Sequence, residues 1–305
     1  MVVAREDVEK AAVRIAPHIR RTPLLQAEPR LVLKLETLQH SGSFKARGGF
    51  NRILTARQAG PLPAAGVIAA SGGNHGMAVA YAARALGVRA EIFVPEVCAP
   101  VKVEGLRLLG AHVTQVGAIY SEAYEASRKR AAETGALEIH AYDQPDVVAG
   151  QGTVAVELLE QADVDTVLVA VGGGGLVAGV VAALDGRAGV VAVEPERIPT
   201  LHAALEAGEP VRVGVSGVGA DALGASQIGQ VAFDTVAGRV SGVLVSDDVI
   251  VEARHALWRE FRVAAEYAGA AALAALRSGA YVPAADERVA VIVCGANTDP
   301  ATLAG

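Results

Sequence analysis

One lysine stands in a setting that suits covalent chemistry. Lys45 lies in the run Ser43-Phe44-Lys45-Ala46, shortly after the apolar, strand-like segment 31–35. A lysine in a dry, aromatic-lined pocket loses part of its preference for the charged form, because burial disfavours charge. The neutral amine is a nucleophile that can hold an aldehyde cofactor as a Schiff base. A lysine taken alone is more often a surface residue at a helix start, so the interpretation depends on the motifs that follow.

A second polar segment, Ser71-Gly72-Gly73-Asn74-His75, follows a predicted strand and opens a predicted helix. Its glycines let the backbone approach a ligand closely, and the free N–H groups of a helix start suit an anion. Ser71 and Asn74 add neutral hydrogen-bonding groups for a carboxylate or a phenolic oxygen. An ordinary strand-to-helix turn with Asn74 as its N-cap explains this segment equally well when it is taken alone.

Four consecutive glycines, Gly172 to Gly175, follow the apolar segment 166–171 and precede a helix predicted to continue to Ala183. Consecutive bare N–H groups at the positive end of a helix dipole make a site for an anion, and phosphate is the natural guest. A dinucleotide fingerprint is an equally good local match, with Gly173-x-Gly175-x-x-Ala178 and Glu194 about 20 residues further on. That alternative leaves Lys45 and the asparagine segment unexplained.

The last motif, Cys294-Gly295-Ala296-Asn297-Thr298-Asp299, ends the final apolar segment. Cys294 therefore falls where a strand's carboxyl end meets a turn, which is the ligand-facing edge of an α/β sheet. A thiol there is a weak, neutral hydrogen-bond partner, although a buried structural cysteine is the alternative. The histidines, such as His140 and His255, lack metal-site spacing, and Ser71 lacks the Gly-x-Ser-x-Gly context of a hydrolase nucleophile.

These motifs are positioned by short β-branched segments that alternate with longer helical patterns. Strands are predicted over residues 31–35, 66–70, 90–94, 112–116, 137–141, 166–171, 189–193, 242–245 and 289–293. Near-continuous apolar strands separated by helices indicate parallel sheets covered on both faces, and hence an α/β fold. Helices are predicted over 75–86, 101–109 and 248–276, the last with a break near Tyr267 to Gly269.

The bulk composition excludes several classes of function. The chain has 305 residues, and its net charge of −6 offers no basic field for nucleic acid or an anionic membrane. The two cysteines fit a reducing compartment, and the charged N-terminal segment does not read as a signal peptide. No run reaches the ~18 apolar residues of a membrane span. We expect a cytoplasmic protein that acts on a small molecule.

Together and in this order, the four motifs resemble the fold-type II pyridoxal-phosphate enzymes, and within them the threonine/serine dehydratase and serine racemase group. The resemblance runs from Arg21-Thr22-Pro23-Leu24 to Asp299. It implies a three-layer α/β architecture similar to the tryptophan synthase β chain, with mainly parallel twisted sheets. A small domain (66–142) would be inserted in a large cofactor-binding domain (1–65 and 143–305), with the site in the cleft between them. A homodimer is also implied.

The resemblance implies a role for each motif. Lys45 would hold pyridoxal 5′-phosphate covalently, Phe44 would pack beside it, and Asn74 would hydrogen-bond the pyridine 3′-oxygen. Cys294 would face the pyridine nitrogen. The phosphate would be held by Gly172, Gly173, Gly174, Gly175 and Leu176, and the substrate carboxylate by Ser71, Gly72, Gly73, Asn74 and His75.

The implied reaction is a β-elimination of a 3-hydroxy amino acid, such as L-threonine or L-serine, to a 2-oxo acid and ammonia. Lys45 would remove the Cα proton as general base. A cysteine at the ring nitrogen does not enforce its protonation, which favours prompt loss of the β-leaving group.

Alternatives lie both inside and outside this group. Racemases carry a second serine where this chain has Gly72, so we expect weak or no racemisation and Lys45 as the only residue that moves the Cα proton. A serine racemase, a 3-hydroxyaspartate or phenylserine dehydratase and a β-replacement enzyme remain alternatives, as does a non-catalytic nucleotide-binding protein. Asp221 matches a segment where some relatives bind a divalent cation, but no acidic partner is evident beside it, and no metal is assigned.

Overall fold

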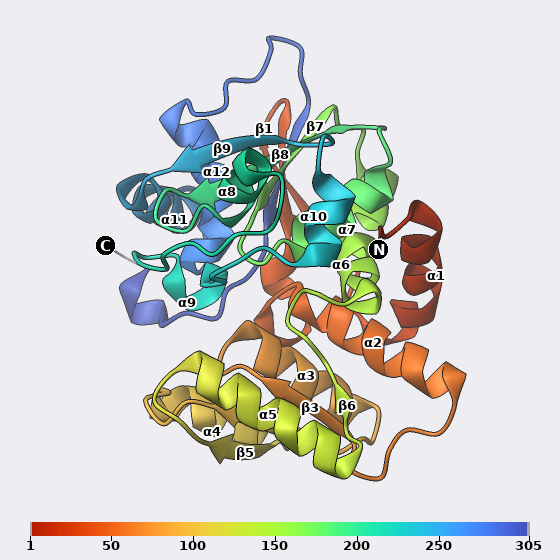
Figure 1. Cartoon of the computed structure of the whole chain (residues 1–305). Helices are drawn as coiled ribbons and strands as arrows, with labels where there is room; N and C mark the ends of the chain where they lie inside the picture. Colours follow the sequence, from red (N-terminus) through yellow and green to blue (C-terminus); the bar gives the residue numbers. More distant parts are fainter. Residues whose placement is uncertain (1, 304–305) are drawn as a thin grey trace.

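Two β-sheets organise the computed structural model, which describes residues 2–303 (Figure 1). The larger has the strand order β1-β2-β10-β7-β8-β9, and only β1 runs antiparallel to its neighbour. Its strands are β1 (Leu24–Glu28), β2 (Leu31–Leu35), β7 (Thr166–Ala170), β8 (Gly189–Pro195), β9 (Ser241–Val245) and β10 (Val289–Val293). Every residue of β7 and β10 is buried, as expected for apolar strands with helices on both faces.

Helices cover both faces of this sheet. Figure 1 shows α1, α6, α7 and α10 on one side, and α8, α11 and α12 on the other. The helices of this part are α1 (Arg5–Ile15), α2 (Lys45–Ala59), α6 (Pro145–Gln161), α7 (Gly175–Leu184), α8 (Thr200–Ala207), α9 (Ala220–Leu223), α10 (Gln230–Val236), α11 (Asp247–Phe261) and α12 (Tyr267–Ser278). Helices α6 and α7 approach closely because glycines meet between them, and a Cβ on Gly179 would lie 2.5 Å from the Gly152 nitrogen.

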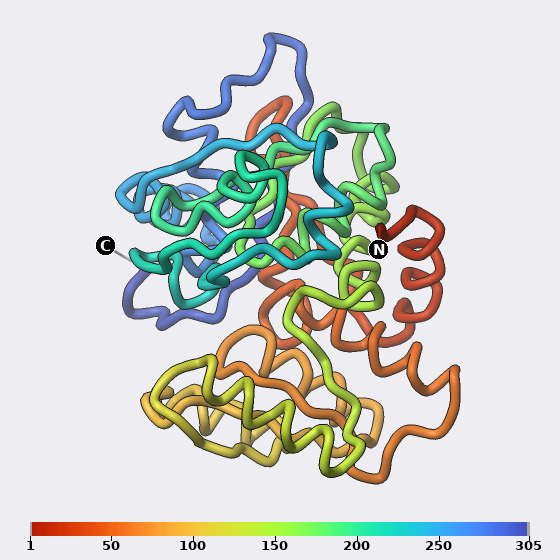
Figure 2. The backbone as a smooth tube through the Cα atoms, viewed as in Figure 1, coloured from red at the N-terminus to blue at the C-terminus, as the bar shows by residue number. Residues whose placement is uncertain are grey.

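The smaller sheet has the order β5-β4-β3-β6, with all strands parallel. It consists of β3 (Val67–Ala70), β4 (Ala90–Val94), β5 (His112–Gln115) and β6 (Leu137–Glu138), with α3 (Asn74–Ala85), α4 (Pro100–Leu108) and α5 (Tyr120–Thr134). Figure 2 shows the chain entering this part after α2 and leaving it before α6. All four strands fall within the segment 66–142, although the domain division itself stays a prediction.

A buried ion network fixes the start of α2, which carries Lys45. The Arg47 guanidinium, with a fully buried side chain, donates to Glu36 on one side (2.7 Å) and to Glu157 of α6 on the other (2.8 Å). Lys34 of β2 also pairs with Glu157, at 2.7 Å. Two cations and two carboxylates thus neutralise one another in the protein interior, as buried charges require. The network ties α2 to β2 and α6, and so orients the first turn of α2.

The predicted three-layer, mainly parallel α/β fold is confirmed, but three elements differ from expectation. Strand β6 covers only Leu137–Glu138, where 137–141 was predicted. Strand β1 was missed, because its exposed polar residues do not form an apolar run. The expected break near Tyr267 to Gly269 is also misplaced: α11 ends at Phe261, and α12 starts at Tyr267. The break lies at 262–266, where Arg262 adopts φ 57° and the Glu266 N–H donates to the Gly295 carbonyl.

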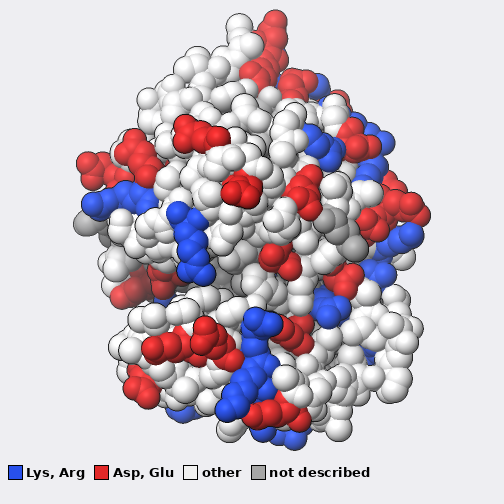
Figure 3. All heavy atoms as spheres, viewed as in Figure 1, with Lys and Arg blue, Asp and Glu red and all other residues white. Residues whose placement is uncertain are grey.

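The surface carries both signs of charge. On the face shown in Figure 3, Lys and Arg are interspersed with Asp and Glu, and no broad field of one sign is visible. Within residues 2–303, no helix is both long and apolar enough to cross a membrane.

Candidate active site

A cavity of about 550 Å³ opens between the parts built on the two sheets, where Figure 3 shows the surface hollowed. All five residues predicted to bind substrate line it, together with Lys45. A smaller pocket adjoins it and shares Lys45, Asn74 and Gly173 with it. This pocket is lined by every residue predicted to bind the cofactor, namely Phe44, Lys45, Asn74, Gly172, Gly173, Gly174, Gly175, Leu176 and Cys294. The structure therefore brings the four motifs together.

Lys45 is the first residue of α2, and its amine lies where the two pockets meet. Its Nζ donates a hydrogen bond to the Ala141 carbonyl (2.7 Å) and lies 5.1 Å from the centre of the Phe44 ring. Burial lowers the pKa of Lys45 to about 8 from an ordinary value of 10.5. Near neutral pH a fraction of the amine is therefore uncharged and nucleophilic.

The glycines form the turn between β7 and the start of α7. Gly174 has φ +87°, which favours glycine, and a Cβ on Gly173 would lie 2.3 Å from ring atoms of Tyr142. Two carbonyls of the turn accept hydrogen bonds: the Gly172 carbonyl from the Thr200 hydroxyl (2.5 Å), and the Gly173 carbonyl from the Gly229 N–H (3.1 Å). The first N–H groups of α7 have no intrahelical acceptor, so this turn can bind an anion.

Asn74, at the start of α3, is held by two residues of the larger part. Its amide nitrogen donates to the Glu266 carboxyl (2.5 Å), and its oxygen accepts from the Asn297 amide (2.6 Å). Asn297 also donates to the Ser41 carbonyl (2.8 Å). Burial raises the pKa of Glu266 to about 7. This network links the two parts of the molecule directly at the pocket.

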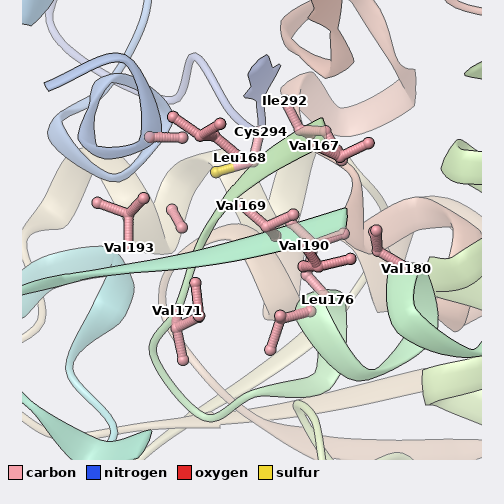
Figure 4. Close-up of a cluster of buried hydrophobic side chains, with 14 of the residues drawn as sticks. Val167, Leu168, Val169, Val171, Leu176, Val180, Val190, Val193, Ile292 and Cys294 are labelled. Carbon is pink, nitrogen blue, oxygen red and sulfur yellow. The ribbon is translucent and has the colours of Figure 1, made fainter. Parts of the chain in front are cut away.

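Cys294 follows β10, is buried, and belongs to the apolar core cluster that Figure 4 draws. Its Sγ lies 3.4 Å from the Ala268 carbonyl, to which the thiol donates. Burial raises the pKa of the Cys294 thiol, so it stays neutral. Its carbonyl accepts from the Phe44 N–H (3.1 Å), which holds the cysteine and the lysine segment together.

The segment 71–75 turns from β3 into α3 at the larger cavity. A Cβ on Gly72 would lie 2.6 Å from the Cys98 thiol, so Cys98 fills the space that a side chain at position 72 would take. The His75 ring is buried with its Nε2 2.9 Å from the Ile139 carbonyl, and burial lowers the pKa of His75 to about 3. His75 is therefore a neutral member of this segment.

The dinucleotide interpretation of the glycine turn is wrong. The buried Glu194 carboxylate accepts from the backbone N–H groups of Leu201 (2.7 Å) and His202 (2.9 Å) and from the Thr200 hydroxyl. It caps α8 and is not available for a ribose. Asp221 pairs with Lys102, and residues 2–303 hold no group of three or more potential metal-ligating side chains.

Sequence reasoning missed Glu266, Tyr142 and Tyr120. Glu266 lies inside the segment 248–276 that was predicted as helical, and only its isolation among alanines and valines could have marked it. Tyr120 lines the large cavity, and Tyr142 lines both pockets. No local pattern distinguishes these tyrosines from surface residues.

The residues present fit pyridoxal phosphate. The glycine turn offers backbone donors to a phosphate and has no room for a Cβ at Gly173. Lys45 offers an amine whose pKa is low enough for it to react with an aldehyde. Asn74 and Cys294 add neutral hydrogen-bonding groups to the same pocket.

The chain is similar to several known proteins. The family model described as "Pyridoxal-phosphate dependent enzyme" matches residues 15–295. The chain is 35% identical over 310 residues to an L-threonine ammonia-lyase from Thermotoga maritima, and the match covers 98% of this chain and 76% of that protein. Among solved structures, maize serine racemase superposes with a TM-score of 0.91 at 32% identity, covering 99% of this chain and 95% of that one. A threonine deaminase from T.th. gives a TM-score of 0.89 at 38% identity, with 97% and 99% of the two chains covered.

Proposed function

Because the chain belongs to the pyridoxal-phosphate dependent enzymes, we propose that it is a threonine/serine ammonia-lyase. It converts a 3-hydroxy amino acid, such as L-threonine or L-serine, to a 2-oxo acid and ammonia. The observation that carries the proposal is the convergence of a low-pKa lysine, an anion-binding glycine turn and the asparagine segment on one pocket. Pyridoxal phosphate, when bound, supplies an aldehyde that takes up the substrate amine and a ring that draws electrons from Cα.

Lys45 holds the cofactor and then moves the proton. With its Nζ free, the Lys45 amine would accept the Cα proton of the bound substrate as general base. Its lowered pKa suits this role, because a base with a pKa near the working pH is substantially unprotonated yet still basic. The hydroxyl leaves Cβ as water, a step that needs a proton donor and no second side-chain base.

The surrounding residues bind and orient. The N–H groups at the start of α3, with Ser71 and Asn74, hold the substrate carboxylate at the positive end of the helix. The Glu266–Asn74–Asn297 network fixes the Asn74 amide. Cys294 and His75 are neutral, so neither places a charge beside the reacting atoms.

The racemase alternative is less favoured. The position of the second racemase base is Gly72, and the space beside it holds the Cys98 thiol. Burial raises the pKa of that thiol, which reduces its competence as a base near neutral pH.

We propose in addition that the enzyme is a cytoplasmic homodimer. Size-exclusion chromatography with light scattering would test the oligomeric state.

The function is tested with purified holoenzyme. We expect a yellow absorbance from the lysine-bound cofactor that borohydride removes, and release of oxo acid from threonine or serine. Lys45→Ala should abolish both signals, whereas Lys129→Ala, at an exposed position, should change neither. Absence of the absorbance from the wild type, or an unchanged Lys45→Ala variant, refutes the proposal. Assays with 3-hydroxyaspartate and phenylserine rank the substrates.

A further inference from the structure

Two charged residues from different parts of the molecule meet at the large cavity. Lys102, in the first turn of α4, donates from its Nζ to the Asp221 carboxylate of α9. Both residues line the cavity together with Lys45. The side chains are 34% and 67% exposed, respectively, so the pair lies at the solvent-accessible end.

The rest of the described lining carries no formal charge at neutral pH. Apart from Lys45, Lys102 and Asp221, the residues around this cavity are apolar, glycine or neutral polar side chains. Once Lys45 is engaged, Lys102 is therefore the single cation of the described lining and Asp221 its single anion. The pair leaves this end of the cavity with no net charge.

The pair lies near the segment proposed to hold the substrate. Cys98 packs against Gly72 of that segment, and Lys102 follows Cys98 by four residues, across the start of α4. Cys98, Lys102 and Asp221 all line the large cavity. Gly72, Cys98 and the ion pair thus line the same cavity as Lys45, within which the substrate side chain must lie.

We propose that Asp221 is a specificity-determining residue, which keeps Lys102 neutralised and so selects neutral 3-hydroxy amino acids against those with a second carboxylate. The inference rests on the function proposed above. A second carboxylate would be attracted by Lys102 alone, but it must displace Asp221 and meets its repulsion. A partly exposed ion pair adds little to stability, so its main effect is on the charge that the cavity presents.

The test uses Asp221→Asn holoenzyme, which frees Lys102 and keeps the shape of the side chain. We expect the ratio of kcat/KM for threo-3-hydroxyaspartate to that for L-threonine to rise about tenfold, as removal of one nearby opposing charge predicts. The double variant Lys102→Met/Asp221→Asn should not show this rise in the kcat/KM ratio, because it lacks the freed cation. Asp286→Asn, at a 94% exposed side chain, is the matched control.

A second readout does not need catalysis. Binding of succinate, an unreactive dicarboxylate, is measured by calorimetry, and Asp221→Asn should tighten it about tenfold while acetate binding is unchanged. If no variant and no wild-type preparation releases oxo acid, the proposed function fails and succinate binding alone decides the inference. If the wild type is active but Asp221→Asn changes neither the substrate ratio nor succinate affinity, or loses activity equally with all substrates, the inference is overturned.

Discussion

Replacing Glu266 by glutamine should remove a pH-dependent loss of stability from the apoprotein. Burial raises the pKa of Glu266 from an ordinary 4.5 to about 7. Between these values the folded protein holds a proton that the unfolded chain has released. The free energy of unfolding that this group contributes is therefore fully present below pH 4.5, and it falls as the pH rises to about 7.

The size of the effect follows from the two pKa values. Their difference corresponds to about 3 kcal/mol, since each pKa unit is worth about 1.4 kcal/mol. Solvent screening reduces this free energy only slightly, because Glu266 is only 6% exposed. Glutamine keeps the oxygen that accepts from Asn74, so the variant loses the titration but retains the 2.5 Å contact as an ordinary hydrogen bond.

The assay is urea unfolding of cofactor-free protein at several pH values between about 5 and about 7.5, at constant ionic strength. The variant should gain up to about 3 kcal/mol relative to wild type across this range. His75, whose pKa is lowered to about 3, makes both proteins more stable as the pH rises, and this slope cancels in the difference. Glu209→Gln, at an exposed carboxylate, should show no such gain. If the free energy of unfolding depends on pH in the same way in wild type and in Glu266→Gln, the reasoning is refuted.

Two further substitutions test the pockets. Gly173→Ala places a methyl group 2.3 Å from the Tyr142 ring and should weaken pyridoxal phosphate binding by about 5-fold to about 150-fold, as overpacking by about 1–3 kcal/mol implies. Gly242→Ala, where a Cβ meets nothing within 4 Å, is the control. Equal cofactor affinities of Gly173→Ala and wild type in a fluorescence titration would contradict the prediction for Gly173. Gly72→Ser should lower the melting temperature by its clash with Cys98, and Gly72→Ser/Cys98→Ala should restore it and produce D-serine from L-serine. Appreciable formation of D-serine by the wild type, measured by chiral chromatography, would contradict the expectation that Gly72 prevents racemisation.

Local sequence patterns predicted those features that depend on local chemistry. The glycine turn, the lysine segment and the apolar strands β7 and β10 each carry their signal in adjacent residues. The parallel sheets followed from the alternation of such strands with helices. The family resemblance then predicted that these distant segments form one site, and the lining of the small pocket brings them together.

The features missed arise from contacts between distant segments. Glu266 acquires its role only because the break between α11 and α12 places it beside Asn74, which is 192 residues away in the chain. The predicted break, near Tyr267 to Gly269, lay a few residues too late, because an arginine such as Arg262 is not the residue expected at a left-handed helix end. The dinucleotide alternative for Glu194 arose for the same reason, since its cap on α8 depends on a turn that the local pattern does not show.

The position of β10 has a consequence for how the chain folds as it is synthesised. This strand follows all the other described strands in the chain, yet it lies between β2 and β7, in the interior of the six-stranded sheet. The four-stranded sheet, by contrast, draws all its strands from residues 67–138 and can form while the later segments are still being made. Until β10 emerges from the ribosome, β2 and β7 expose apolar edges that need protection from aggregation. Because Cys294 directly follows β10, the cofactor pocket is completed only at this late step, and cofactor capture reports that folding has finished.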